Sequence, residues 1–176
     1  MPDPDWVTAT ATRNFASSDP LLDWLNLYGE DNGFVRDQDY DDYDSRTDFS
    51  LFIMHKGIEF ETAVAKHIST ITSVHTVIKE GERRSSSEVF ARTQKAMESG
   101  ESVIYQAALW HEPSRTYGTA DFLIRSDKLQ ELFPGSVSSE ESRVSAPGLG
   151  ENSWHYRVID AKFTTLHFLS KGDISS

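Results

Sequence analysis

The chain has 176 residues, contains no cysteine and carries a formal net charge of −11 at pH 7. This length is typical of one domain that buries a sizeable core, and the lack of cysteine excludes disulfides, thiolate zinc sites and cysteine nucleophiles. We find neither a signal peptide nor an apolar run long enough to span a membrane, so we expect a soluble intracellular protein with no membrane partner. The acidic charge argues against nonspecific binding of polyanions.

Residues 1–50 are predicted to form an N-terminal helical and acidic-loop extension. Leucines and a tryptophan recur at helical spacing after Asp19, a candidate N-cap, and predict a short amphipathic helix to Tyr28, ended by Gly29. Six aspartates follow between Asp37 and Asp48.

The acidic segment DQDYDDYDSRTD begins with the aspartate spacing of a calcium-binding loop. However, Asp42 stands where that loop needs glycine, and Asp48 replaces its bidentate glutamate. We interpret the segment as a solvated acidic loop. A calcium-binding acidic protein stays open as a third hypothesis about function.

A helix from about Asp48 to Ile71 is predicted by an apolar stripe that contains one carboxylate. Glu61 lies in the centre of this stripe, whereas Glu59 is predicted to face water. A lone carboxylate on a buried face costs several kcal/mol unless a cation or metal compensates it. Glu61 is therefore a candidate metal ligand, and a Glu61–Lys162 ion pair is the alternative. The stripe consists of Met54, Gly57, Ile58, Val64, Ala65 and Ile68.

The middle of the chain is predicted to alternate strands and helices. We first expect a strand from Val74 to Lys79 and a helix from Ser87 to Ser99 that is closed by Gly100. Two strands follow, from Ser102 to His111 and from Tyr117 to Ser126, joined by the turn EPSR. The last part is an exposed loop over residues 128–153 that begins with a short helical turn, LQELF. Asp121 is the only carboxylate in the second strand of the hairpin.

The segment YRVIDAKF, from Tyr156 to Phe163, predicts a further strand with charges near its end. Because side chains alternate along a strand, Asp160 and Lys162 share one face and stand side by side. Charges are rarely placed on a buried strand unless they are paired or bind something. Together with Asp121, these residues indicate the start of a metal site.

The order of these features resembles the PD-(D/E)XK nuclease superfamily, particularly its RecB-like branch. The matching pieces are KGIEFE with Glu61, VIYQAAL followed by GTADFLIR with Asp121, and VIDAKF with Asp160 and Lys162. The resemblance covers residues 52–163 and depends on the joint order of the pieces rather than on any single motif.

The resemblance implies a restriction-endonuclease-like core, an α/β fold with a mixed β-sheet flanked by α-helices, and a deoxyribonuclease that uses Mg²⁺ or Mn²⁺. It implies that Asp121 and Asp160 are the principal metal ligands, that Glu61 completes the set directly or through water, and that the Ala161 carbonyl adds an oxygen. Lys162 would orient the attacking water and stabilise charge. We prefer this role to that of a general base, because neighbouring carboxylates favour the ammonium form of Lys162.

The sequence departs from this family after the last predicted strand. RecB-like members carry a helix there with a Gln and a Tyr that helps to position the nucleic acid, whereas LHFLSKGDISS contains no Q-x-x-x-Y. The chain is therefore either a fragment of a longer protein or an abbreviated core. We favour the fragment, and expect the core of residues 51–176 to be truncated at its C-terminal end and to be completed by a further domain or segment. Gln106 is either a substitute contact or a buried, satisfied amide.

The sequence thus predicts a metal-dependent nuclease that acts on nucleic acid, with DNA as the expected partner. The alternative is a catalytically inactive nuclease-like module that binds nucleic acid or a partner protein. In that case the carboxylates are retained as structural ion pairs.

Overall fold

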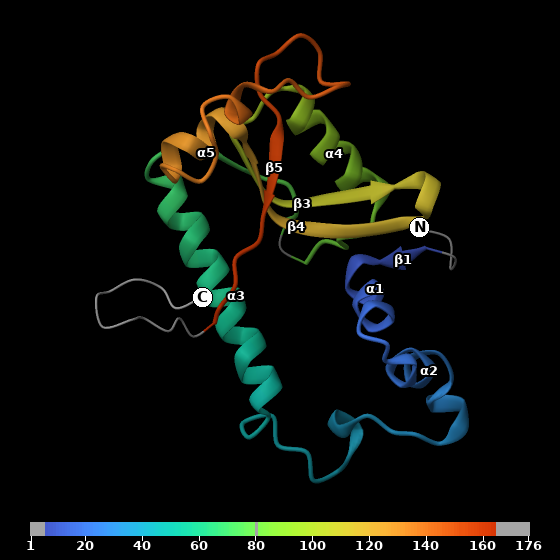
Figure 1. Ribbon diagram of the computed structural model, residues 1–176. Helices are drawn as coiled ribbons and strands as arrows, with labels where there is room; N and C mark the ends of the chain where they lie inside the picture. Colours follow the sequence, from blue (N-terminus) through green and yellow to red (C-terminus); the bar gives the residue numbers. More distant parts are fainter. Residues whose placement is uncertain (1–5, 80, 165–176) are drawn as a thin grey trace.

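The computed structural model describes residues 6–79 and 81–164 as an α/β fold in which helices flank a mixed, open sheet (Figure 1). Five strands form the sheet, in the order β1-β4-β3-β2, and β5 also pairs with β4. The strands are β1 (Val7–Thr8), β2 (Val74–Thr76), β3 (Val103–His111), β4 (Thr116–Arg125) and β5 (Tyr156–Ile159).

The β3–β4 hairpin is the centre of the sheet. The two strands are antiparallel, and the short 3-10 turn Glu112–Ser114 joins them, which confirms the turn predicted from EPSR. β2 adds in parallel to β3, and β5 adds antiparallel to β4. β1 pairs in parallel with residues 116–117 of β4, so the N-terminal extension contributes a strand to the sheet. β1 and β5 therefore occupy different stretches of β4.

The described helices are α1 (Ala9–Ala16), α2 (Pro20–Tyr28), α3 (Phe49–Ser69), α4 (Ser87–Glu98) and α5 (Ser126–Leu132). Three of the helices, α2, α3 and α4, begin and end close to the predicted positions, whereas α1 was not predicted. Asp48 caps α3 by accepting the Leu51 N–H at 2.9 Å. α4 begins at Ser87 as predicted, with Ser86 as its N-cap, and α5 begins earlier than the LQELF turn.

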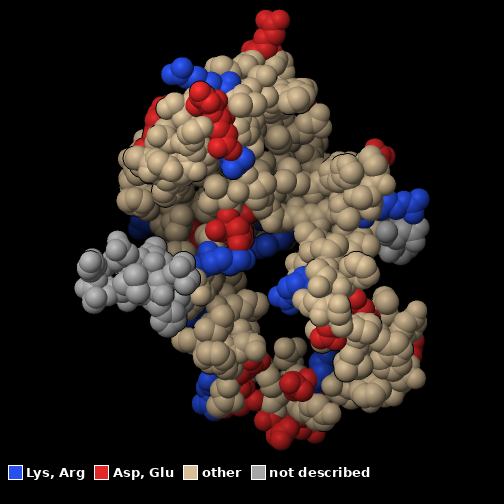
Figure 2. Space-filling model, in the orientation of Figure 1, with Lys and Arg blue, Asp and Glu red and all other residues tan. Residues whose placement is uncertain are grey.

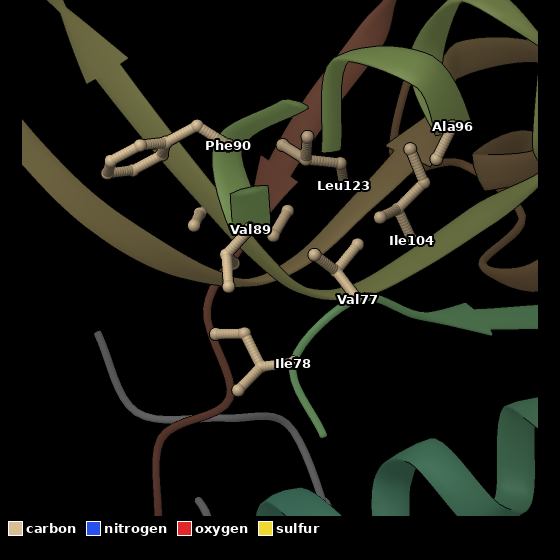
Figure 3. Packing of buried hydrophobic residues seen from close by; sticks show 9 residues of the cluster. Val77, Ile78, Val89, Phe90, Ala96, Ile104 and Leu123 are labelled. Atoms are coloured by element: carbon tan, nitrogen blue, oxygen red, sulfur yellow. The ribbon is translucent and has the colours of Figure 1, made fainter. Parts of the chain in front are cut away.

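Two hydrophobic clusters lie on opposite faces of the sheet. The cluster shown in Figure 3 joins α4 and the segment after β2 to the sheet, and it comprises Val77, Ile78, Val89, Phe90, Ala96, Ile104, Ala107, Ala108 and Leu123. The other cluster joins α3 and α5 to the opposite face, and it comprises Ala65, Ile68, Val103, Phe122, Ile124, Leu129 and Val137. Burial of these apolar side chains holds both layers of helix on the sheet.

The apolar stripe of α3 is buried only in the second half of the helix. Ala65 and Ile68 are buried against the sheet, whereas Met54 and Ile58 are 52% and 53% exposed. The first half of α3 extends beyond the sheet in Figure 1, and the space-filling view in Figure 2 shows an opening between this half and the α1–α2 segment. The prediction that Met54 and Ile58 belong to a buried face is therefore wrong, because no sheet lies under that part of the helix. Among the described residues, no helix is long and apolar enough to cross a membrane.

The core on the α4 side predicts a large difference between two isoleucine substitutions. Ile104 is completely buried, so Ile104→Ala should lower the free energy of unfolding by about 2–5 kcal/mol. Ile58→Ala is the matched control and should change it by less than about 0.5 kcal/mol, because that side chain is exposed. Urea unfolding followed by circular dichroism measures both values, and equal losses would contradict this description of the core.

Candidate functional site

Three elements that are distant in sequence bring acidic side chains to the α3 side of the sheet. Glu61 lies on α3, Asp121 lies on β4, and Asp160 follows the end of β5. Burial raises the pKa of the Asp121 carboxyl, and the nearby Glu61 and Asp160 carboxylates raise it further, while a hydrogen bond from Ala161 opposes the shift. The predicted acidic residues are therefore close enough to interact electrostatically.

β5 ends where the Asp121 side chain, in place of a backbone carbonyl of β4, accepts a hydrogen bond from the chain that follows β5. The ladder between β4 and β5 runs from Arg125↔Tyr156 to Phe122↔Ile159 and then stops. The next N–H that would point towards β4 belongs to Ala161, and it donates to Asp121 Oδ2 at 2.7 Å. The side chain of Asp121 thus replaces a ladder partner at the point where the two strands separate.

Asp160 and Lys162 lie beyond the strand and not on it. The expected strand from Tyr156 to Phe163 is too long, because the Asp121–Ala161 hydrogen bond interrupts its ladder after Ile159. The Asp160 and Lys162 side chains are 51% and 74% exposed, and Lys162 Nζ lies 2.7 Å from Asp160 Oδ2. Their predicted side-by-side arrangement is confirmed, but their burial in the sheet is not.

The start of β5 is fixed by contacts that are independent of the acidic residues. The backbone N–H of Ser126 donates to the carbonyl of His155 at 2.7 Å, and the His155 N–H donates to Ser126 Oγ at 3.1 Å. The Tyr156 hydroxyl donates to the carbonyl of Glu101 at 2.7 Å, and burial raises the Tyr156 pKa to about 12. The segment that carries Asp160 therefore leaves a firmly held strand.

The β3–β4 ladder is interrupted directly beside Asp121. Tyr105 pairs with Phe122 and Ala107 pairs with Ala120, so this register places Gln106 opposite Asp121, but these two residues do not form a ladder pair. Gln106 has a φ of 52°, a left-handed value that is uncommon for any residue other than glycine. Such conformations inside a regular element cluster at functional sites.

Glu61 is held by neutral partners. Gln106 Nε2 donates to Glu61 Oε1 at 3.3 Å, and the Tyr105 hydroxyl lies near Glu61. Burial raises the pKa of Tyr105, and the nearby Glu61 carboxylate raises it further. The ion pair of Lys162 is with Asp160 and not with Glu61, contrary to the alternative drawn from the sequence.

Sequence reasoning placed Gln106 correctly in the strand before Asp121 but missed Tyr105. The structure shows Gln106 as a half-buried, hydrogen-bonded amide. Tyr105 could have been noticed, because it stands with Gln106 in an otherwise apolar strand. Glu59 is exposed as predicted, and its Oε2 lies 2.6 Å from Lys56 Nζ.

The oxygen donors of this site suit a hard divalent cation, although they do not enclose one. Within residues 6–79 and 81–164, no three His, Asp or Glu side chains come together as a ready-made metal site. Asp160 nevertheless lies near enough to Asp121 to raise its pKa, a repulsive arrangement when both are ionised. Mg²⁺ is commonly bound through only one or two carboxylates and several waters. The chemistry of the pair therefore fits Mg²⁺ or Mn²⁺.

Two aspartates of the acidic loop have local structural partners. Asp48 accepts both the Leu51 N–H at the start of α3 and the Tyr43 hydroxyl, and Asp44 pairs with Arg46. The α3 cap and a local turn therefore use these carboxylates. The segment LHFLSKGDISS, which follows the last predicted strand and lacks a Q-x-x-x-Y motif, falls on residues 166–176, outside the described residues.

Charged side chains of both signs lie on the face shown in Figure 2. There the described lysines and arginines are interspersed with acidic side chains and do not form a continuous basic surface.

The chain matches no protein-family model, and its similarity to curated proteins and to solved structures does not reach significance.

The raised pKa of Asp121 predicts a pH-dependent effect of Asp121→Asn. Because this pKa is higher in the folded protein than in the unfolded chain, ionisation of Asp121 costs stability as the pH rises from about 3.9 through the folded-state value. The variant should therefore be modestly more stable than the wild type at pH 7, and the difference should shrink towards pH 4.

Urea unfolding at several pH values measures this difference. Asp44→Asn is a control of opposite sign, because the hydrogen bond from Arg46 lowers the pKa of Asp44. A stabilisation by Asp121→Asn that stayed constant between pH 4 and pH 8 would contradict the proposed origin of the effect.

Proposed function

We propose that this chain is a metal-dependent nuclease that hydrolyses phosphodiester bonds of DNA, with Mg²⁺ or Mn²⁺ as its cofactor. The observation that carries the proposal is the convergence of Glu61, Asp121 and Asp160 from three separate elements, with Lys162 adjacent. A fold that only needed stability would not be expected to gather like charges at one place, because their repulsion opposes folding.

Each residue of this group would have a distinct role. Asp121 and Asp160 would hold the cation, the Ala161 carbonyl would add an oxygen, and Glu61 would complete the set directly or through water. When bound, the cation supplies a hydroxide nucleophile at neutral pH and offsets negative charge that develops on the phosphate.

Lys162 would act as a positively charged group and not as a general base. Its hydrogen bond to Asp160 raises the pKa of its ammonium group, so the proton is held more firmly than on an isolated lysine. The long and exposed side chain could turn from Asp160 towards a phosphate oxygen once a substrate is bound. It would then orient the attacking water and stabilise charge.

The arrangement of elements supports a restriction-endonuclease-like core. The α3 helix covers one face of the antiparallel β3–β4–β5 unit and α4 covers the other. Glu61 lies on a helix, Asp121 on the following strand pair and Asp160 directly after β5, which is the order of the pieces that resemble the PD-(D/E)XK superfamily. This agreement in order supports the proposal for the whole segment between Glu61 and Lys162.

An inactive nuclease-like module is the second candidate, and two contacts favour it. Lys162 already neutralises Asp160, and one Asp121 oxygen already accepts the Ala161 N–H. In such a module the carboxylates would serve as structural partners, and the protein would bind nucleic acid or another protein without cleaving it.

Calorimetric titration with Mn²⁺ tests the metal site. The wild-type chain should bind Mn²⁺, and Asp160→Ala should lose that binding while retaining its circular dichroism spectrum, because the cation would lose one of its two principal carboxylates. Glu59→Ala is the matched control, since Glu59 is an exposed carboxylate of α3 paired only with Lys56 among the described residues. Equal binding by the wild type and Asp160→Ala, or no binding by either, would overturn the proposed metal site.

Cleavage of DNA in the presence of Mn²⁺ separates the two candidate functions. Lys162→Ala should lower kcat by about 10²–10³-fold, the usual loss when one charge-stabilising group is removed, while the fold persists. Lys56→Ala, which removes another lysine paired with a carboxylate, should leave kcat unchanged. A Lys162→Ala chain that unfolds, combined with a wild type that cleaves nothing, would instead support the inactive module.

A further inference from the structure

Gln106 has a backbone conformation that its position in a strand does not explain. Three described residues other than glycine have a positive φ, namely Ser18, Gln106 and Arg115. Ser18 lies between α1 and α2, and Arg115 ends the β3–β4 turn, where left-handed residues are common. Gln106 lies in the middle of β3, where a left-handed residue interrupts an otherwise regular ladder.

The interruption changes the direction of side chains without changing the register. The pairs Tyr105↔Phe122 and Ala107↔Ala120 keep the same register on both sides of Gln106 and Asp121. Regular alternation would place Gln106 on the opposite face from Tyr105. Instead, the Gln106 amide lies 3.5 Å from the Tyr105 hydroxyl, and both side chains contact Glu61 on α3.

Asp121 shows the same departure from alternation on β4. Phe122 packs in the cluster on the α3 side, so a regular strand would send Asp121 to the α4 side. Asp121 instead interacts electrostatically with Glu61 and Tyr105 on the α3 side. The two residues that face each other across the interruption therefore both turn towards α3.

We propose that Gln106 is a positioning residue that acts through Glu61, an inference that rests on the proposed metal-dependent function. The left-handed backbone of Gln106 aims its amide at Glu61 Oε1 and holds that carboxylate facing Asp121. An amide suits this task, because it donates a hydrogen bond without carrying a positive charge. Glu61 is thus oriented but not neutralised, and its charge stays available to a divalent cation.

Mn²⁺ affinity in a double-mutant cycle tests this role. Gln106→Asn keeps an amide and tolerates a left-handed φ, but its side chain is one methylene shorter and does not reach Glu61. It should weaken Mn²⁺ binding by about 10-fold, the lower end of the loss seen when a residue that orients a metal ligand is removed. In the Glu61→Ala background the same substitution should have no further effect, because the group through which it acts is gone.

Matched variants separate this role from a general structural one. Gln94→Asn shortens another glutamine that donates to a glutamate, Glu98 at 2.8 Å on α4, and should leave Mn²⁺ affinity unchanged. The thermal midpoint of each protein is measured in parallel. Gln106→Gly removes the backbone strain and replaces Gln106→Asn in the cycle if that variant does not fold.

The outcomes distinguish this inference from the function on which it rests. Wild-type affinity in Gln106→Asn, or an equal loss of affinity with and without Glu61, overturns the positioning role while the metal site stands. Absence of Mn²⁺ binding in the wild type overturns both the proposed function and the role of Gln106. A loss that depends on Glu61, with an unchanged thermal midpoint, supports the inference.

Discussion

The Asp121 carboxylate accepts the Ala161 N–H at 2.7 Å, and the geometry of the candidate site depends on this hydrogen bond. It satisfies a backbone donor that has left the β4–β5 ladder, and it ends β5 at Ile159. The chain then carries Asp160 and Lys162 away from the sheet into an exposed position. A continued ladder would have kept both residues in the sheet. Because the hydrogen bond ends the ladder, Asp160 and Lys162 are instead accessible next to Asp121.

Repulsion among the carboxylates is the opposing constraint. Asp121 is partly buried and lies near both Glu61 and Asp160, which is why its pKa is raised. Lys162 offsets part of this repulsion through Asp160, and Gln106 donates a hydrogen bond to Glu61 without adding charge. The surrounding fold has to supply the stabilisation that this arrangement lacks, and the two hydrophobic clusters provide it from both faces of the sheet.

The placement of the site follows from the rigid parts of the fold. Ala65 and Ile68 fix the second half of α3 on the sheet, and Glu61 lies one turn before Ala65. Ser126 and Tyr156 fix the start of β5. The site thus lies where two firmly packed elements meet the interrupted β3–β4 ladder. The first half of α3 has no such support, and it exposes several large apolar side chains, including Phe49, Phe52 and Met54.

The sequence by itself determined the helices α2, α3 and α4, the central hairpin and the identity of the unusual charges. Helical spacing and N-cap residues act over a few positions, so α2, α3 and α4 could be predicted closely, and an apolar run split by EPSR specified the hairpin. A charge within an apolar pattern is likewise a local signal, and it identified Glu61, Asp121 and Asp160. Only the tertiary structure decided where β5 ends, which way Asp121 and Gln106 point, and which partner Lys162 takes. These features depend on contacts between β3, β4, β5 and α3, and a regular periodicity cannot represent a ladder that breaks at Gln106 and Asp121.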